Sequence, residues 1–356
     1  MSHSEPCLLI RAEGGPGIGA GHVMRCLALA QEAISRGGRV LYDTGLSPDS
    51  GLGRRLLAEG VAIEPGVPPQ NLDLDARSVV DKAHRIGADA VVVDGYRFDA
   101  DYQRQIHQAG LALLWIDDEA HAAPYTADVV LNQNPHASAE LYQPRADHTH
   151  LLLGPHHALL RREMLRQGQV ERSLGRPVRN LLVTLGGGDA DNATARVLEG
   201  LALALGGRGE VPEVRVVVGG FNPHLAAIRQ QADSLGFRVL HAVDDMAPLL
   251  AEADLAITAA GSTCWELAYF GLPALVVTLA ENQRPIAQGV AQRGMAVDLG
   301  WHHALEPERL AAAVEALLGD AEKRRHMSER GQTWVDGHGA RRVLDAVLSR
   351  RTSPRP

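Results

Sequence analysis

The chain has 356 residues, which at roughly 150 residues per domain suggests about two domains. Hydrophobic residues make up 45% and charged residues 22%, so the composition excludes a disordered or fibrous chain. With 35 basic residues against 43 acidic ones the formal net charge is −8, and no overall positive field would hold nucleic acid or an anionic membrane. Any anionic ligand must therefore be bound by local contacts.

Short runs rich in Val, Leu and Ile alternate with longer segments of helical period, which is typical of parallel sheets covered by helices. In the first half the expected strands are residues 7–12, 39–43, 90–94, 112–117 and 128–131. A polar, Arg-rich connector of helical composition follows at 159–176. In the second half the expected strands are 180–185, 214–218, 239–243, 255–258 and 274–277.

These elements predict an α/β fold of two Rossmann-like domains, residues 1–157 and 158–356. Ligands of such folds bind at the carboxyl ends of the strands, so we expect a cleft faced by the carboxyl ends of both sheets.

The first strand leads into a glycine-rich loop, residues 14–21, directly before a helix. Such a loop lets the backbone approach a ligand, and the free N–H groups of the helix start point at an anion. A dinucleotide fingerprint fits poorly, because no Gly-x-Gly is followed by two residues and another Gly, and no P-loop lysine is present. We expect no cofactor.

His22 and its neighbours are the strongest catalytic candidates of the first half. The helix dipole disfavours an imidazolium at this position, so we expect a neutral His22 ring that can take a proton as a general base; a histidine that only caps the turn is the alternative. Arg25 lies one helical turn further and could pair with phosphate or substrate. Arg11, at a strand end inside an apolar run, needs a partner for its charge.

Two further strand ends carry polar residues. Asp94 ends one strand and is followed by Tyr96, and Asp117 ends the next, so we expect Tyr96 and Asp117 to face the cleft beside His22. The acidic run after Trp115, with His121, has no metal-ligand spacing and is interpreted as a capped, solvated turn. The pairs 156–157 and 302–303 also lack partners at ligand spacing, so no metal site is expected.

Three loops of the second half follow buried strands and contain residues that suit a nucleotide diphosphate. They are Gly187, Gly188 and Asp189 in the first, Ser262, Thr263 and Glu266 in the second, and Asn282 and Gln283 in the third. Glu266 could accept from two ribose hydroxyls, or it could form a capping box with Thr263. The glycines could equally form a tight turn, with Asp191 or Asn192 capping the next helix.

The compartment is inferred from missing signals. Residues 1–7 show no basic region followed by an apolar run, and no apolar stretch reaches the roughly 20 residues of a membrane helix. The three cysteines, Cys7, Cys26 and Cys264, form no CxxC pair, which argues against a disulfide framework or a zinc ribbon. We expect a cytoplasmic protein without membrane insertion.

Taken in order, these motifs resemble the UDP-2,4-diacetamido-2,4,6-trideoxy-β-L-altropyranose hydrolases of pseudaminic acid biosynthesis, which have a glycosyltransferase-B-like architecture. The matching positions are Arg11, Ile18-Gly19-x-Gly21-His22-x-x-Arg25, Asp94-x-Tyr96, Ile116-Asp117-Asp118, Ala158-Leu159-Leu160-Arg161, Gly187-Gly188-Asp189 with Asn192, and Gly261-Ser262-Thr263 with Glu266 through Asn282-Gln283. Glu13 departs from the aspartate that the family pattern leads us to expect.

The resemblance implies a metal-independent, inverting hydrolase of a UDP-linked diacetamido-trideoxyhexose. It implies that His22 activates water, with Tyr96 assisting at the sugar, and that the second-half loops hold UDP. Arg11, Gly21, Arg25, Asp94, Asp117 and Arg161 are further substrate-binding candidates, of which Arg11 or Arg25 would orient the sugar. A glycosyltransferase of the same architecture, a non-catalytic nucleotide-sugar sensor and a 2-epimerising hydrolase are the alternatives.

Overall fold

The computed structural model describes residues 5–15, 20–66 and 71–352 and divides the chain into two compact units. Unit 1 comprises the chain up to Arg162 together with the segment from Gly337 onward, and unit 2 comprises Glu163–Asp336. The boundary therefore lies close to the predicted one. The assignment of the whole of 158–356 to the second domain is wrong for the last segment, which belongs to unit 1.

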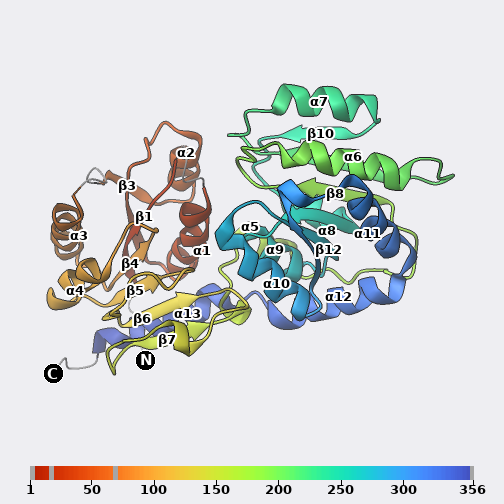
Figure 1. Cartoon of the computed structure of the whole chain (residues 1–356). Coiled ribbons are helices and arrows are strands. Elements are labelled where there is room, and N and C mark those ends of the chain that lie inside the picture. Colours follow the sequence, from red (N-terminus) through yellow and green to blue (C-terminus); the bar gives the residue numbers. More distant parts are fainter. Residues whose placement is uncertain (1–4, 16–19, 67–70, 353–356) are drawn as a thin grey trace. The chain divides into compact units, whose positions relative to one another are not determined.

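Unit 1 is built on a parallel sheet with the strand order β3-β2-β1-β4-β5-β6-β7 in the described residues (Figure 1). Its strands are β1 (Cys7–Ala12), β2 (Arg39–Thr44), β3 (Ala62–Pro65), β4 (Ala90–Asp94), β5 (Leu113–Ile116), β6 (Val129–Asn132) and β7 (His150–Leu153). Its helices are α1 (Gly21–Ser35), α2 (Gly51–Ala58), α3 (Leu72–Ile86), α4 (Ala100–Gln108) and α13 (Gly339–Leu348).

Alternation along the strands sends side chains of unit 1 into two separate cores. Leu8 and Ile10 of β1 belong to the core shared with α1 and α13. Leu9 belongs to the core shared with α3 and α4 on the other face. Because successive side chains of a strand point to opposite faces, the position of a residue in β1 or β4 decides which helices it meets.

Unit 2 repeats the arrangement with the order β10-β9-β8-β11-β12-β13 in the described residues. Its strands are β8 (Asn180–Thr184), β9 (Glu213–Val218), β10 (Arg238–His241), β11 (Leu255–Ala259), β12 (Ala274–Thr278) and β13 (Ala296–Trp301). Its helices are α5 (Arg162–Gln167), which begins at the boundary, α6 (Ala193–Leu205), α7 (Leu225–Ser234), α8 (Ala247–Glu252), α9 (Thr263–Tyr269), α10 (Arg284–Gln292), α11 (Pro307–Gly319) and α12 (Ala321–Trp334).

All ten predicted strands are present, with ends that shift by one or two residues. The sequence missed β3, β7 and β13, which lie at sheet edges and are only partly buried. Edge strands lack the continuous apolar run of a strand buried on both faces, so their pattern is weak. Within the predicted connector only α5 is an α-helix.

The C-terminal helix α13 packs on unit 1 because its apolar side chains recur at helical spacing. Ala340, Val343, Leu344 and Val347 are buried in the core that contains α1 and the sheet. In Figure 1 this blue helix lies among the yellow strands of the first sheet. At its start Gly339 passes so close to unit 1 that a Cβ there would lie 2.1 Å from the carbonyl oxygen of Ala158.

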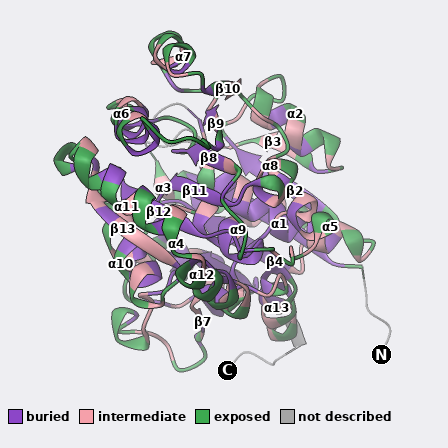
Figure 2. Cartoon of the chain, turned by 90° about the vertical axis from the view of Figure 1, so that its right-hand side faces the viewer, coloured by how far each residue is buried: buried purple, intermediate pink, exposed green. Residues whose placement is uncertain are grey.

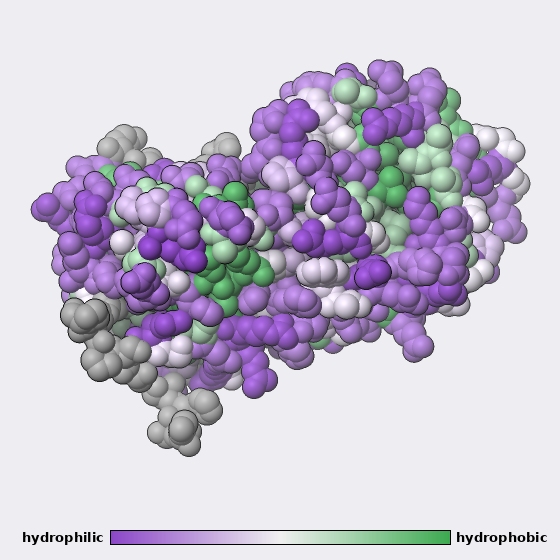
Figure 3. Space-filling model, turned by 60° about the horizontal axis from the view of Figure 1, so that its bottom comes forward, coloured by the Kyte–Doolittle hydropathy of each residue, from purple (hydrophilic) through white to green (hydrophobic). Residues whose placement is uncertain are grey.

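Burial differs between the sheets and the helices that cover them. The central strands of each sheet are buried, the edge strands are only partly buried, and the helices present exposed outer faces (Figure 2). The surface seen in Figure 3 is mostly hydrophilic, with apolar side chains confined to small areas. Among the described residues no helix combines the length and apolar character that a bilayer crossing requires.

Candidate functional site

The first candidate cluster of side chains lies where the strand order of unit 1 reverses. β1 and β4 are neighbours although β2 and β3 intervene in sequence, and Ala12 pairs in register with Asp94. Loops at such a reversal open outward from the carboxyl ends of the strands, which makes room for a ligand. The helix that follows β1 begins at the exposed Gly21 and brings His22 and Arg25 to this point. Residues 16–19 of the predicted glycine loop lie outside the described residues.

His22, Arg25 and Asp94 form one buried network. The Asp94 carboxylate contacts His22 Nδ1 at 2.7 Å, and it accepts hydrogen bonds from Arg25 Nε and Nη2, both at 2.6 Å. We assign the proton to Nδ1, donating to Asp94, which leaves the lone pair on Nε2. No residue in the described parts of the chain hydrogen-bonds Nε2. The capping alternative for His22 does not apply, because its ring bonds to β4.

Charges around Asp94 keep it ionised. Burial opposes ionisation, but the charge of Arg25 and the hydrogen bonds from Arg25 and His22 outweigh it and hold the pKa of Asp94 well below its ordinary value. Arg25 also donates to Asp118, and Cys26 donates from Sγ to Asp94 at 3.3 Å. Asp94 is fully buried, so it orients His22 instead of reaching a substrate.

Tyr96 lies beside His22, as predicted. Its ring meets the His22 ring edge-on with centroids 4.7 Å apart, and 40% of the residue is exposed. On its other side lies His121, with centroids 6.4 Å apart. An exposed tyrosine next to the candidate base is positioned to contact a sugar ring or its hydroxyl groups.

Asp117 is buried and shapes the turn that carries His121. Its carboxylate accepts from the N–H groups of Glu119 and Ala120 and from the Tyr125 hydroxyl, and it contacts His121 Nδ1 at 3.1 Å. Asp117 and Tyr96 were both predicted to lie beside His22, but of the two only Tyr96 contacts the His22 ring in the described residues, and Asp117 contacts His121 instead. The prediction of a capped, solvated turn did not include this Asp117–His121 pair.

Arg11 lies in a different cluster on the opposite face of the sheet. Its guanidinium binds both carboxylate oxygens of Asp75, at 2.7–3.3 Å, and the carbonyl oxygen of Asp43 at 3.2 Å. Arg97 and Tyr102 bind the same Asp75 carboxylate. Arg11 lies two residues after Leu9 in β1, so its side chain points to the same face of the sheet as Leu9, toward α3 and α4. Asp94 lies two residues after Val92 in β4 and points to the other face, toward α1. This geometry makes Arg11 a structural residue, contrary to the sugar contact expected of it.

Arg161 is half-buried directly before α5, where the chain passes from unit 1 to unit 2. Among the described residues, the side-chain hydrogen bonds of His22, Arg25 and Asp94 go to one another, to Cys26 and to Asp118, and Arg161 is not one of these partners.

The three predicted loops of unit 2 follow three neighbouring strands. They follow β8, β11 and β12, and the strand order reverses between β8 and β11. Gly187 and Gly188 are exposed, and a Cβ at either would meet nothing within 4 Å, so the backbone there is open to a ligand. Parallel topology therefore brings the loops to one sheet edge, as the sequence predicted.

Asp189 caps helix α6, which the sequence assigned to Asp191 or Asn192. Its carboxylate accepts from the N–H groups of Ala193 at 2.7 Å and Thr194 at 2.9 Å, and from the Thr194 hydroxyl. Asn192, at φ 55°, makes no side-chain capping bond. Because the carboxylate occupies the helix start, Asp189 supports the loop and does not bind a ligand phosphate directly.

The second and third loops differ in the side-chain hydrogen bonds and the exposure of their predicted residues. Ser262 precedes α9 without a side-chain capping bond, and Thr263 and Glu266 are half-buried at the start of that helix. Gln283 accepts through Oε1 from the Leu279 N–H at 2.9 Å, which fixes the loop. Asn282 next to it is exposed.

Two further residues shape these clusters: Asp118, which the sequence motifs included without giving it a role, and Gly219, which they did not include. Asp118 binds Arg25 and accepts from Asn134 Nδ2 at 2.9 Å, so it completes the network around His22. Gly219 lies under the first glycine loop, where a Cβ would be 2.5 Å from Gly187 Cα. Asp118 follows Asp117 at the end of a predicted strand, and Gly219 begins a Gly-Gly pair directly after β9. Their positions at the carboxyl ends of strands could therefore have marked both residues as candidates.

Comparisons with known proteins agree with this architecture. Residues 181–339 match the family model "Glycosyltransferase family 28 C-terminal domain". Over 97% of this chain and 100% of the other, the structure resembles a crystal structure of Acinetobacter baumannii MurG, with a TM-score of 0.66 and 20% identity. The chain has a glycosyltransferase-B-like fold. A structure of Anabaena HepE in complex with UDP and glucose is similar with a TM-score of 0.62 and 14% identity, over 99% of this chain and 100% of that chain.

Two curated relatives connect this fold to sugar metabolism. A spore coat polysaccharide biosynthesis protein of Bacillus subtilis is 29% identical over 56% of this chain and 58% of its own length. The UDP-2,4-diacetamido-2,4,6-trideoxy-β-L-altropyranose hydrolase of Campylobacter jejuni is 22% identical over 82% of this chain and 98% of its own length. The chain thus spans little more than half of the Bacillus protein, and of a Methanocaldococcus jannaschii relative it spans 56%.

Proposed function

We propose that this protein is a UDP-sugar hydrolase that cleaves the anomeric C–O bond of a UDP-linked diacetamido-trideoxyhexose. The observation that carries the proposal is the His22–Asp94 pair at the carboxyl end of β4, with Nδ1 held by a buried carboxylate. The similarity to the Campylobacter hydrolase, which extends over most of both chains, supports the same chemistry.

In the proposed reaction His22 Nε2 removes a proton from a water molecule as that water attacks the anomeric carbon. The bond between this carbon and the UDP oxygen breaks with inversion, and its electron pair leaves with UDP. Asp94 stabilises the imidazolium that forms, as an orienting carboxylate does in other histidine bases. Tyr96, beside His22, would contact the sugar.

The nucleotide is assigned to unit 2. The match to a glycosyltransferase C-terminal domain, residues 181–339, covers most of this unit. In the proposal the exposed amides near Gly187 and Gly188 and the side chains of Ser262, Thr263, Glu266 and Asn282 receive UDP. Backbone N–H groups can neutralise a diphosphate without a net positive protein, which agrees with the net charge of −8.

A glycosyltransferase is the second candidate, because the family model that matches unit 2 is named for that activity. It would use the same base to activate an acceptor hydroxyl in place of water. The two reactions differ in the co-substrate that UDP release requires. A hydrolase releases UDP from the sugar nucleotide with water alone, whereas a glycosyltransferase also needs an acceptor.

The decisive experiment is UDP release by the purified protein from a panel of UDP-, GDP- and CMP-sugars without an acceptor. Release from a UDP-diacetamido sugar, with one ¹⁸O from H₂¹⁸O at the anomeric carbon, is the expected result. Release only after an acceptor is added would establish the transferase. Binding without turnover would establish a sensor, and a sugar product inverted at C2 would establish a 2-epimerising hydrolase.

A further inference from the structure

Three potential metal ligands, which the sequence keeps far apart, meet in unit 2. Asp191 lies in the loop between β8 and α6, and His302 and His303 form the short 3₁₀ turn after β13. Asp191 Oδ2 lies 3.6 Å from His302 Nε2 and 3.7 Å from His303 Nε2. One ligand atom from each residue lies within 4.8 Å of the other two.

These distances do not describe hydrogen bonds. A separation of 3.6 Å between nitrogen and oxygen is beyond a hydrogen bond of ordinary strength. His302 is only 2% exposed, and its Nε2 is buried without a hydrogen-bond partner among the described residues. A buried polar atom without a partner in the chain costs free energy, so His302 Nε2 is expected to bind a group from outside the chain.

We propose that Asp191, His302 and His303 bind a divalent transition-metal ion, with zinc as the best fit. Zinc–nitrogen and zinc–oxygen bonds of about 2.0–2.2 Å at tetrahedral angles separate neighbouring ligand atoms by about 3.4 Å. The two separations from Asp191, 3.6 and 3.7 Å, need only a small contraction to reach that value, and the two histidine atoms lie within 4.8 Å of each other. Two imidazoles and one carboxylate form a ligand set that zinc accepts, and the fourth position is left for water.

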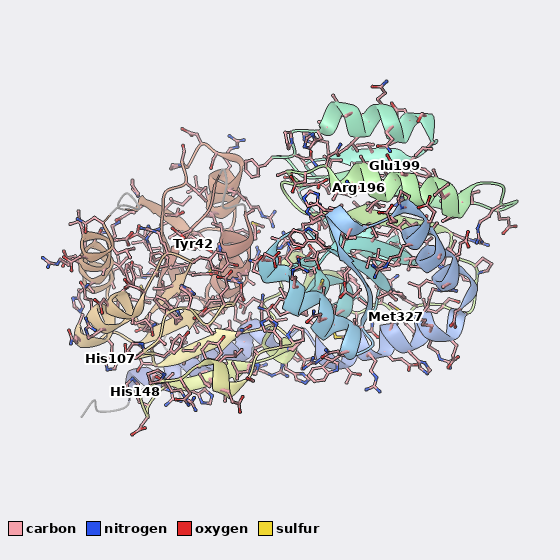
Figure 4. The ribbon with its side chains drawn as sticks, in the orientation of Figure 1. Tyr42, His107, His148, Arg196, Glu199 and Met327 are labelled. Atoms are coloured by element: carbon pink, nitrogen blue, oxygen red, sulfur yellow. The ribbon has the colours of Figure 1, made fainter. Side chains whose placement is uncertain are left out.

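The surroundings suit such a site. The side chains of Asp191 and His303 are 56% and 55% exposed, so an ion can enter from solvent. Arg196 on α6, labelled in Figure 4, donates to the carbonyl oxygen of His303 at 3.1 Å and holds the turn.

A bound ion would connect the turn after β13 to the loop that follows the glycines of β8. This inference does not depend on the proposed hydrolase, because none of the three residues belongs to the His22 network. It departs from the sequence expectation that His302 and His303 lack partners, since Asp191 is more than 100 positions away in the chain.

A second cluster in unit 1 provides an internal control. The rings of His107 and His148 stack with centroids 4.7 Å apart, and Asp128 lies near them; Figure 4 labels the two histidines. His148 Nε2 faces the carbonyl oxygen of Thr126 at 3.1 Å, and Asp128 already accepts from the Leu113 N–H at 2.8 Å. Substitution of His148 therefore tests whether zinc simply binds any histidine cluster of this chain.

The experiment is calorimetric titration of the EDTA-treated, full-length protein with zinc chloride, repeated with cobalt to record the visible absorption of a tetrahedral site. The variants are His303→Ala and Asp191→Asn, both exposed positions, and the matched control is His148→Ala. We expect one zinc ion bound with high affinity per chain, weakened at least about 10–100-fold by either variant and unchanged in the control.

Several results would overturn the proposal. The wild type could bind no zinc, or His303→Ala could bind it as tightly as the wild type, or His148→Ala could abolish binding. Circular dichroism of each variant establishes that a loss of binding is not a loss of folding.

Discussion

His22 depends on two other side chains for its candidate role as a base. Asp94 accepts from Nδ1, which fixes the ring and its tautomer, and Arg25 holds Asp94 in its ionised form. A buried carboxylate and a buried cation thus set the orientation and the tautomer of the candidate base, and neither group needs to contact a substrate.

Replacing His22 with Asn should lower kcat for UDP release by about 10²–10⁴-fold, because general-base help is lost. Affinity for UDP should change little, since UDP is assigned to unit 2. Steady-state kinetics and calorimetry with UDP measure the two effects separately. His326→Asn, at an exposed position on α12, is the control, and near-normal turnover of His22→Asn would remove His22 from the mechanism.

His121 is held as an imidazolium by its two neighbours. Nδ1 faces Asp117 at 3.1 Å and Nε2 faces the carbonyl oxygen of Phe98 at 3.0 Å, and only the protonated ring donates to both. The hydrogen bond to Asp117 raises the pKa of His121, against the opposing effect of burial. The contribution of His121 to stability is therefore complete below its unfolded pKa, about 6.5, and is lost as the pH rises through its folded pKa.

The pH dependence of unfolding tests this contribution. We expect His121→Gln to lower the free energy of unfolding most below about pH 6, with a difference from wild type that shrinks at higher pH. Urea unfolding at a series of pH values measures it, with His326→Gln as the control. A difference that stays constant with pH would show that His121 is neutral in the folded protein.

At the scale of the element, the first loop of unit 2 is held by its own side chains. Asp189 occupies the start of α6, and Gly219 lets the loop after β9 pack against Gly187, whose carbonyl oxygen accepts from the Phe221 N–H at 3.2 Å. These contacts within unit 2 fix the shape of the loop, and in the proposed function the loop would present its exposed glycine amides to UDP in a fixed arrangement.

Asp189→Ala should destabilise the protein by about 0.5–2 kcal/mol, which is the usual cost of losing a helix cap. Chemical denaturation in EDTA measures the change, and Asp191→Ala is the control because it makes no capping bond. The control should stay within about 0.5 kcal/mol of wild type. Equal destabilisation by the two variants would contradict the assignment of the cap.

At the scale of the whole molecule, the chain finishes unit 1 after it has completed unit 2. Helix α13 buries Val343, Leu344 and Val347 in the core of unit 1, so the two ends of the chain stabilise the same unit. Unit 2, in contrast, is one continuous segment, Glu163–Asp336.

Leu344→Ala should lower the stability of unit 1 by about 2–5 kcal/mol, the range for truncating a buried leucine. Hydrogen exchange followed by mass spectrometry should show faster exchange in the strands of unit 1 and little change in unit 2. Leu317→Ala, buried in the core of unit 2, should give the converse pattern. Faster exchange in unit 2 after Leu344→Ala would contradict the division of the chain.

The sequence by itself determined the two α/β halves, the strands buried on both faces, and the loops at their carboxyl ends. These follow from local signals: continuous apolar runs, glycines and helix starts, each read within a few residues. It also placed Tyr96 beside His22, since both follow strands that a parallel sheet brings together.

Only the tertiary structure decided which side chains meet. Arg11 and Asp94 both lie at the carboxyl ends of buried strands, yet the alternation of side chains turns Arg11 to α3 and Asp94 to α1, so they belong to different networks. Asp189 rather than Asp191 caps α6, α13 returns to unit 1, and Asp191 meets His302 and His303 across more than 100 positions. Each of these depends on contacts between distant segments, which hydrophobic pattern and local spacing do not encode.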